Sequence, residues 1–211
     1  MLWPTVPHCC CHDSDVLLLI DASTANEGND PWSISRCIRK RAGGGGKGCL
    51  WAVADYKTAN DDGYASGWNL RQTMTADRSA VLDAIDASED AAGGETVDTQ
   101  QLDALAKAAD EWTASLGGRS GVPRLVLWHG NRRADTTTTT ISEAKSSLDG
   151  ASIDLFALNA SVDGSGIDID DQAGKLVSES CRLLHGATGL GNAQACCRRL
   201  HALMCPLFLR A

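Results

Sequence analysis

The sequence has no apolar run long enough to cross a membrane. No stretch approaches the roughly 18 to 20 apolar residues that a spanning helix needs, so we expect no membrane span. The first twelve residues, MLWPTVPHCCCH, also lack the charged start and apolar centre of a signal peptide. We therefore expect either a cytoplasmic protein or, if a leader has been removed, an extracellular one.

Positive charge is scarce as well. The chain carries 19 basic residues against 27 acidic ones, which gives a net charge of -8. The basic residues form no long run, only RKR at 39 to 41 and two Arg-Arg pairs. Nucleic acid is therefore not an expected partner.

Cysteine, by contrast, is plentiful in a chain whose 211 residues fit one domain of ordinary size. The nine cysteines are an odd number, so at least one thiol is unpaired within the chain. The cluster CCCH at 9 to 12 lacks the gap that lets zinc ligands converge, and we expect buried thiols and disulfides instead. Residues 1 to 14 are expected to form a Cys-rich lead-in, and cysteine usage leaves the compartment open.

Strand and helix patterns alternate along the chain. Trp68 to Thr75 alternates apolar and polar residues, which is typical of an edge strand or hairpin, and Thr75 or Asp77 is expected to cap the helix that follows. The tract TTTTT at 136 to 140 is expected to be the loop and cap of another helix. Four continuous apolar runs predict buried, mutually parallel strands: Val16 to Ile20, Leu50 to Ala54, Leu125 to Trp128 and Ile153 to Leu158.

Helical patterns lie between these runs and predict an α/β fold. The expected helices cover residues 33 to 42, 80 to 87, 100 to 112, 140 to 148 and 171 to 180. The expected architecture is a mostly parallel central sheet of about six strands with helices on both faces. CRLLH at 181 to 185 is the sixth strand expected, and residues 191 to 204 are expected to form a terminal helix.

Four segments together resemble the von Willebrand factor A (VWA) domain family. The family's first strand and its Asp-x-Ser-x-Ser loop are resembled by DVLLLIDAS. The family's next strand, helix, glycine turn and helix are resembled by NLRQTMTADRSAVLDAIDA followed by AAGGETVDTQQLDALAKAADEW. RLVLWHGNRRAD resembles the fourth-strand motif, and IDLFALNASVDGSGIDIDDQAGKLVSESCRLLHGAT the closing strand, helix and strand. The resemblance covers residues 15 to 188 and implies a three-layer Rossmann-like fold, with residues 189 to 211 as a C-terminal helix packed on the same domain.

The resemblance also implies a metal-ion-dependent adhesion site (MIDAS). In this family a divalent cation sits on loop oxygens and leaves one position open for an acidic residue of a partner. Asp21 and Ser23 match the first-loop ligands, and Thr96 matches the second-loop threonine. The third-loop aspartate falls on Asn131, or on His129 if the alignment is shifted.

Two departures from the family pattern weaken the expected site. Ala25 stands where the second serine belongs, and Asn131 replaces a carboxylate. A hard cation such as Mg²⁺ gains most from carboxylates, so we expect Mg²⁺ or another divalent ion to bind weakly or not at all unless Asp98 or Asp135 compensates. The plainer alternative is that Asp21 and its neighbouring serine only bond backbone amides at the strand end.

These features predict a non-enzymatic, adhesion-type module that binds a protein partner, through an acidic residue of that partner if a cation is held. The expected partner-binding residues are Asn26, Trp32, Asp98 and Arg132, with Trp32 and Arg132 as anchors because aromatic and Arg side chains are common at interface hot spots. A metal-free scaffold that acts only in assembly is the alternative. The oligomeric state stays open.

Two enzyme hypotheses are alternatives to the binding module. His129 and Cys196 could pair as base and thiol of a peptidase-like hydrolase, since QAC at 194 to 196 begins a caspase-type signature. A glycine-rich turn leading into a helix precedes this cysteine, which is the wrong context, and we expect the two side chains to lie more than about 10 Å apart. A dinucleotide site is disfavoured because DASTANEG lacks the Gly-x-Gly-x-x-Gly turn.

Overall fold

The computed structural model describes residues 13–23, 48–58, 64, 67–92, 99–130, 138–159, 167 and 172–177. The helix expected from Ser33, the strand expected at 181 to 185 and the terminal helix expected at 191 to 204 lie outside these residues, as does most of the lead-in. The domain boundaries therefore stay predictions.

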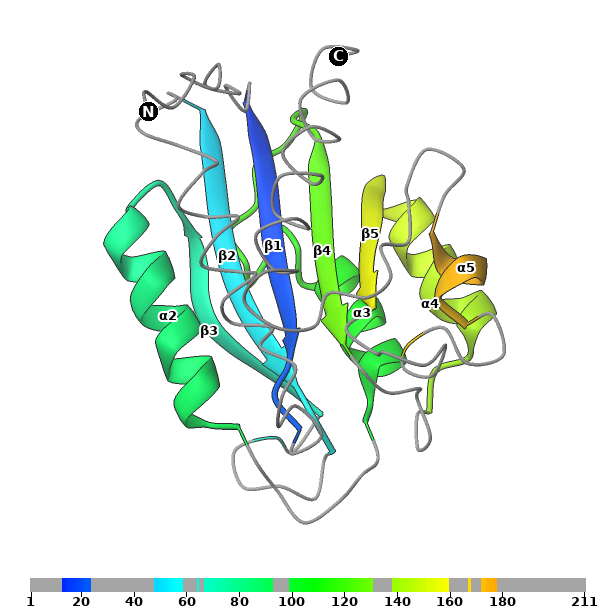
Figure 1. The fold of residues 1–211 in the computed structure, drawn as a ribbon. Coiled ribbons are helices and arrows are strands. Elements are labelled where there is room, and N and C mark those ends of the chain that lie inside the picture. The colour runs from blue at the N-terminus through cyan, green and yellow to red at the C-terminus, as the bar shows by residue number, and fades with distance from the viewer. Residues whose placement is uncertain are drawn as a thin grey trace, which may run out of the picture.

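A five-stranded sheet forms the centre of the described structure (Figure 1). Its order is β3-β2-β1-β4-β5, and every neighbouring pair is parallel except β2 with β3. The strands are β1 (Ser14–Asp21), β2 (Cys49–Tyr56), β3 (Trp68–Thr75), β4 (Arg124–Gly130) and β5 (Ile153–Asn159). The four apolar runs are thus confirmed as parallel strands, and the alternating segment 68 to 75 is confirmed as an antiparallel strand at one end of the order.

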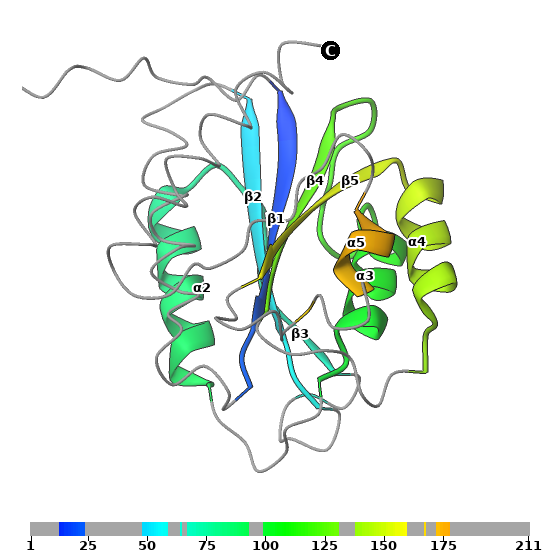
Figure 2. The ribbon, with the colours of Figure 1, turned by 45° about the vertical axis from the view of Figure 1, so that its right-hand side comes forward.

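Helices cover both faces of the sheet (Figure 2). On one side lies α2 (Arg78–Asp90), and on the other lie α3 (Gln101–Asp110), α4 (Ile141–Gly150) and α5 (Gln172–Leu176). Side chains alternate along β1, so Leu17 and Leu19 join the core cluster under α3 and α4, while Leu18 faces the α2 side. The three-layer α/β architecture is confirmed. None of the helices in the described part of the chain is long and apolar enough to cross a bilayer.

Side-chain caps fix where two of these helices begin. Asp77 accepts hydrogen bonds from the backbone amides of Ser79 and Ala80, so it, and not Thr75, caps α2. Thr140 and Glu143 form a reciprocal capping box at α4, which confirms the last threonine of the TTTTT tract as a cap.

The strand register brings three strand ends to the same edge of the sheet. Asp21 pairs with Tyr56 across β1 and β2, and Ile20 pairs with His129 across β1 and β4. The ends of β1, β2 and β4 therefore lie side by side. Open α/β sheets bind ligands at this carboxyl edge.

Candidate functional site

Asp21 ends β1 at the carboxyl edge and is fully buried. Its Oδ1 atom accepts a hydrogen bond of 2.9 Å from the backbone amide of Ser23. This contact is the local turn that the plainer interpretation of Asp21 predicts. It uses the Oδ1 atom of the Asp21 carboxylate.

The Ser23 hydroxyl is the feature that the local turn does not explain. Ser23 is only 2 % exposed, and within the described part of the chain its Oγ atom has no hydrogen-bond partner. Buried hydroxyl groups are normally paired, because an unpaired one loses its bonds to water without compensation. A divalent cation on Asp21 and Ser23 would supply the missing partner, so these two residues fit the ion that the resemblance implies.

The end of β4 lies directly beside Asp21. A Cβ atom placed on Gly130 would be 3.6 Å from Asp21 Oδ2. The first loop and the third loop of the expected site therefore begin in contact with each other. Asn131, the expected third-loop ligand, is the next residue in the chain but lies outside the described residues.

His129 points to the other side of the sheet. It is 1 % exposed and pairs with Ile20, whose side chain alternates with that of Asp21. The side chains of His129 and Asp21 are thus on opposite faces. This placement favours Asn131 over His129 as the third-loop residue of a cation site. The distance from His129 to Cys196 stays a prediction, because Cys196 lies outside the described residues.

The second loop, which carries Thr96, is described only at its two ends. Lys57, just after β2, donates a 2.8 Å hydrogen bond to the Ala91 carbonyl at the end of α2. Thr99, on the far side of the loop, is fully buried. Thr96 itself and the expected partner-binding residues lie outside the described residues: Asn26, Trp32, Asp98 and Arg132.

Tyr56 is a residue of this edge that the sequence analysis missed. Its hydroxyl donates to the His129 carbonyl and accepts from Trp128 Nε1, both at 3.0 Å. Burial, together with the negative charge of Asp21, raises the pKa of Tyr56 well above its ordinary value, so the hydroxyl keeps its proton. Nothing local in the sequence signals these contacts, because they join residues 72 and 73 positions apart.

The cation site would be poor in charged ligands. No three His, Cys, Asp or Glu side chains in the described residues are grouped so that they could hold a metal ion. Among the described residues, Asp21 is the carboxylate that the family resemblance places in the ligand set, and the other expected ligands are neutral: Ser23, Thr96 and Asn131. Mg²⁺ gains little from such neutral ligands.

A second polar cluster lies on the α2 side of the sheet. Asp55, fully buried, accepts bonds of 2.8 Å from the Tyr64 hydroxyl and 2.6 Å from Arg71 Nε. Burial raises the pKa of Asp55 above its ordinary 3.8, and the Arg71 charge partly offsets this rise. The cluster ties β2 to β3 and contains none of the expected site residues.

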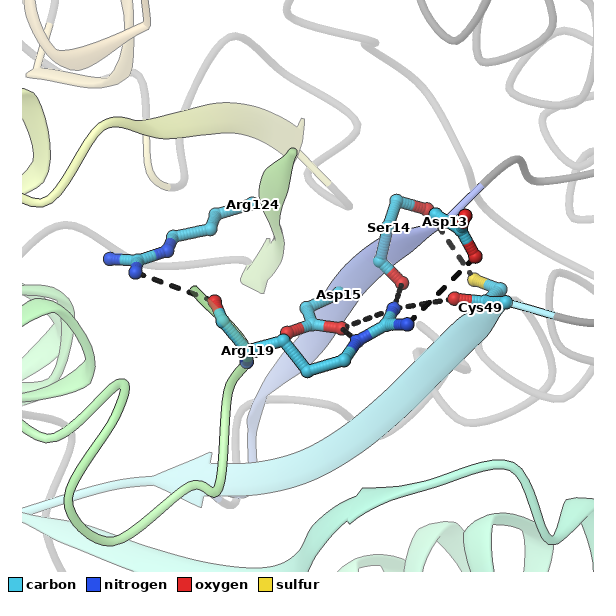
Figure 3. A network of polar contacts seen from close by, with 7 residues as sticks. Asp13, Ser14, Asp15, Cys49, Arg119 and Arg124 are labelled. Carbon is cyan, nitrogen blue, oxygen red and sulfur yellow. Dashed lines mark hydrogen bonds and ion pairs between the residues drawn. The ribbon is translucent and has the colours of Figure 1, made fainter. Parts of the chain in front are cut away.

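A third cluster lies at the amino edge, at the opposite end of β1 from Asp21 (Figure 3). Arg119 bonds the buried carboxylate of Asp15 and donates to the carbonyls of Ser14 and Gly48. Arg124 in turn donates to the Arg119 carbonyl. Every polar group of Asp15 is used within the fold, so this cluster holds strands together and offers no open ligand position.

Comparison with known proteins identifies solved structures that share this fold. No protein-family model matches the chain, and no curated protein matches it in sequence. Three structures of proximal thread matrix protein 1 from the mussel byssus match with TM-scores of 0.65, 0.66 and 0.63 at 16 %, 16 % and 12 % identity. The matches cover 92 to 95 % of this chain and 47 % of the other, so the chain spans about half the length of these structures. One of the three has a zinc-occupied MIDAS motif. At these identities the likeness shows a shared fold, the Rossmann-like VWA fold.

Proposed function

We propose that this chain is a non-enzymatic protein-binding module of the VWA type that engages its partner at the carboxyl edge of the sheet through a divalent cation. The observation that carries the proposal is the buried Ser23 hydroxyl, which has no hydrogen-bond partner among the described residues, beside the buried Asp21 carboxylate. Such a pair at the end of the first strand is the arrangement that the family resemblance implies.

In this proposal the expected ligands contribute different oxygen atoms to the ion. Asp21 supplies the negative charge, and Ser23 supplies a neutral oxygen fixed by its place in the turn. Thr96 and Asn131 complete the ligand set in the proposal, and the partner contributes a carboxylate at the remaining position. With Ala25 and Asn131 in place of stronger ligands, binding of Mg²⁺ is weak. The zinc in a mussel byssus structure of the same fold supports testing Zn²⁺ as well.

The partner surface in this proposal is the rim of the three loops. Asn26 and Trp32 belong to the first loop, Asp98 to the second and Arg132 to the third. The similarity to a byssus matrix protein supports an extracellular, matrix-type setting for this binding. Residues 15 to 188 form the module, and the partner is a protein that presents an acidic side chain.

The test is a calorimetric titration of the protein with Mg²⁺, Mn²⁺ and Zn²⁺. Asp21→Asn and Ser23→Ala should each weaken the binding of whichever ion binds best, because each removes a ligand. Ser14→Ala is the matched control, since Ser14 is a fully buried serine at the other end of β1 that bonds Cys49. Binding that survives the loss of both Asp21 and Ser23 would place the ion elsewhere.

Two further measurements separate a cation site from a metal-free scaffold. The double variant Ala25→Ser with Asn131→Asp should bind cations more tightly than the parent, because it restores a hydroxyl and a carboxylate. A short peptide that carries one Asp is then titrated into the ion-loaded protein, against the same peptide with Asn. If the double variant gains no affinity for cations, the ligand assignment is wrong, and the chain acts as a metal-free scaffold.

A further inference from the structure

We infer that Tyr56 is a positioning residue that fixes the backbone from which the third loop of the proposed cation site departs. The inference rests on the proposed function, which it deepens by adding a residue that is not itself a ligand. The supporting observation is that the Tyr56 side chain, which starts from β2, makes its hydrogen bonds to β4.

The side chain of Tyr56 reaches over a neighbouring strand. Tyr56 ends β2 and pairs with Asp21 of β1, whereas both partners of its hydroxyl lie on β4. Because β1 lies between β2 and β4 in the sheet (Figure 1), the Tyr56 side chain has to cross β1 to reach these partners. The residue is 0 % exposed, so no water competes for its two hydrogen bonds.

The bonded carbonyl belongs to the last peptide of β4. The His129 carbonyl is part of the peptide that joins His129 to Gly130, and Asn131 follows directly. The hydroxyl packs closely on this peptide, since a Cβ atom on Gly130 would be only 2.3 Å from the Tyr56 oxygen. Glycine is therefore the residue that admits this contact, and the phenol sets where the third loop begins.

The same hydrogen bonds leave the Tyr56 hydroxyl without a proton to donate to Asp21. A phenol has a single proton, and Tyr56 gives it to the His129 carbonyl. Tyr56 therefore does not neutralise Asp21 by donating to it, although Asp21 is close enough for its charge to raise the pKa of the phenol.

The variant Tyr56→Phe tests the inference, because it removes the hydroxyl and keeps the ring. Cation affinity, measured by calorimetry in the parent and in the Ala25→Ser, Asn131→Asp background, should fall about tenfold, as is usual when a group that orients a metal site is lost. Tyr64→Phe is the matched control. It is the other tyrosine of the chain, it is 2 % exposed, and its hydroxyl also makes two hydrogen bonds, on the opposite face of the sheet.

A merely structural role predicts a different result. Both variants should lower the midpoint of urea unfolding, but only Tyr56→Phe should weaken cation binding. Equal cation affinity in the two variants, at a similar loss of stability, would overturn the inference. If Tyr56→Phe does not fold, Trp128→Phe replaces it. That change removes the bond donated to the hydroxyl together with part of a buried ring, and it keeps the bond to the His129 carbonyl, so a smaller loss of affinity in the same direction is expected.

Hydrogen exchange of the ion-free protein separates this inference from the proposed function. In Tyr56→Phe the amides of residues 130 to 133 should exchange faster than in the parent, while Tyr64→Phe should leave them unchanged. If no form of the protein binds a cation, the proposed function fails, and faster exchange at 130 to 133 still supports the positioning role. Unchanged exchange there refutes that role whatever the ion does.

Discussion

Replacing Arg119 with alanine should destabilise the protein strongly, because it leaves a buried carboxylate without its cation. Asp15 is fully buried, and Arg119 Nε and Nη2 lie 2.8 and 2.7 Å from its Oδ1 atom. The same guanidinium group bonds the carbonyls of Ser14 and Gly48. After the substitution, Asp15 keeps the backbone amide of residue 119 as a donor but loses the positive charge.

The size of the effect follows from the burial of the two partners. Removing one member of a buried ion pair costs about 3 to 5 kcal/mol. The Arg119 side chain is 32 % exposed, so water can replace part of what is lost, and we expect a loss of about 2 to 3 kcal/mol. For a chain of this length that corresponds to a fall in Tm of roughly 5 to 10 °C.

Urea unfolding followed by circular dichroism measures this change, with Arg124→Ala as the matched control. Among the described residues, Arg124 bonds two carbonyl oxygens and no carboxylate. Its loss should therefore leave no buried charge unpaired there and cost about 1 kcal/mol. Arg119→Lys should fall between the parent and Arg119→Ala, because lysine keeps the charge and loses the planar fork. Adding Asp15→Asn to Arg119→Ala should restore part of the stability. If Arg119→Ala costs no more than Arg124→Ala, the buried charge of Asp15 is not what Arg119 stabilises.

Two other predictions concern the carboxyl edge and α4. Gly130→Ala should lower the free energy of unfolding by about 1 to 3 kcal/mol, because the new Cβ atom would lie 2.3 Å from the Tyr56 oxygen. The same substitution should cost less in the Tyr56→Phe background, which lacks that oxygen. Equal costs in urea unfolding of the two backgrounds would contradict the clash. Hydrogen bonds with Thr140 lower the pKa of Glu143 below its ordinary 4.5, so its contribution to stability is present above the unfolded-state pKa and is lost as the pH falls through the folded-state pKa. Glu143→Gln should therefore lower Tm at neutral pH and not in acid, and a difference that is the same at both pH values would show that the carboxylate charge is not involved.

The sheet could be predicted from the sequence because its signals are local. A strand buried on both faces must be apolar at successive positions, and runs such as Leu125 to Trp128 satisfy this without reference to any other part of the chain. The edge position of β3 was likewise visible in its alternating residues. The sequence could not decide whether Thr75 or Asp77 caps α2, since both have suitable side chains. In the structure Thr75 accepts a hydrogen bond from the backbone amide of Asp77 instead.

The interior of the candidate site could be predicted only in part. A motif places Asp21 and Ser23 at a strand end, and the structure has them at the end of β1, while their role as ligands stays a prediction. Tyr56 was not predicted, because its contacts depend on which strands become neighbours, and no local pattern encodes that order. The same reason applies to Arg119 at the opposite edge of the sheet. The burial of the Ser23 hydroxyl, and its lack of a partner in the part of the chain that the structure describes, also follow from three-dimensional packing and not from its place in the sequence.

The central position of β1 has a consequence for how the chain folds during synthesis. β1 is the first of the described strands to be made, yet one of its two neighbours, β4, lies so far along the chain that Arg119 meets Asp15 across 104 positions. At ribosomal rates of about 5 to 20 residues per second, one edge of this apolar strand waits roughly 5 to 20 s for its partner. An unpaired apolar edge is a site for aggregation. Substitutions that slow the pairing of β1 with β4 should therefore reduce the yield of folded protein in cells more than their effect on equilibrium stability would suggest.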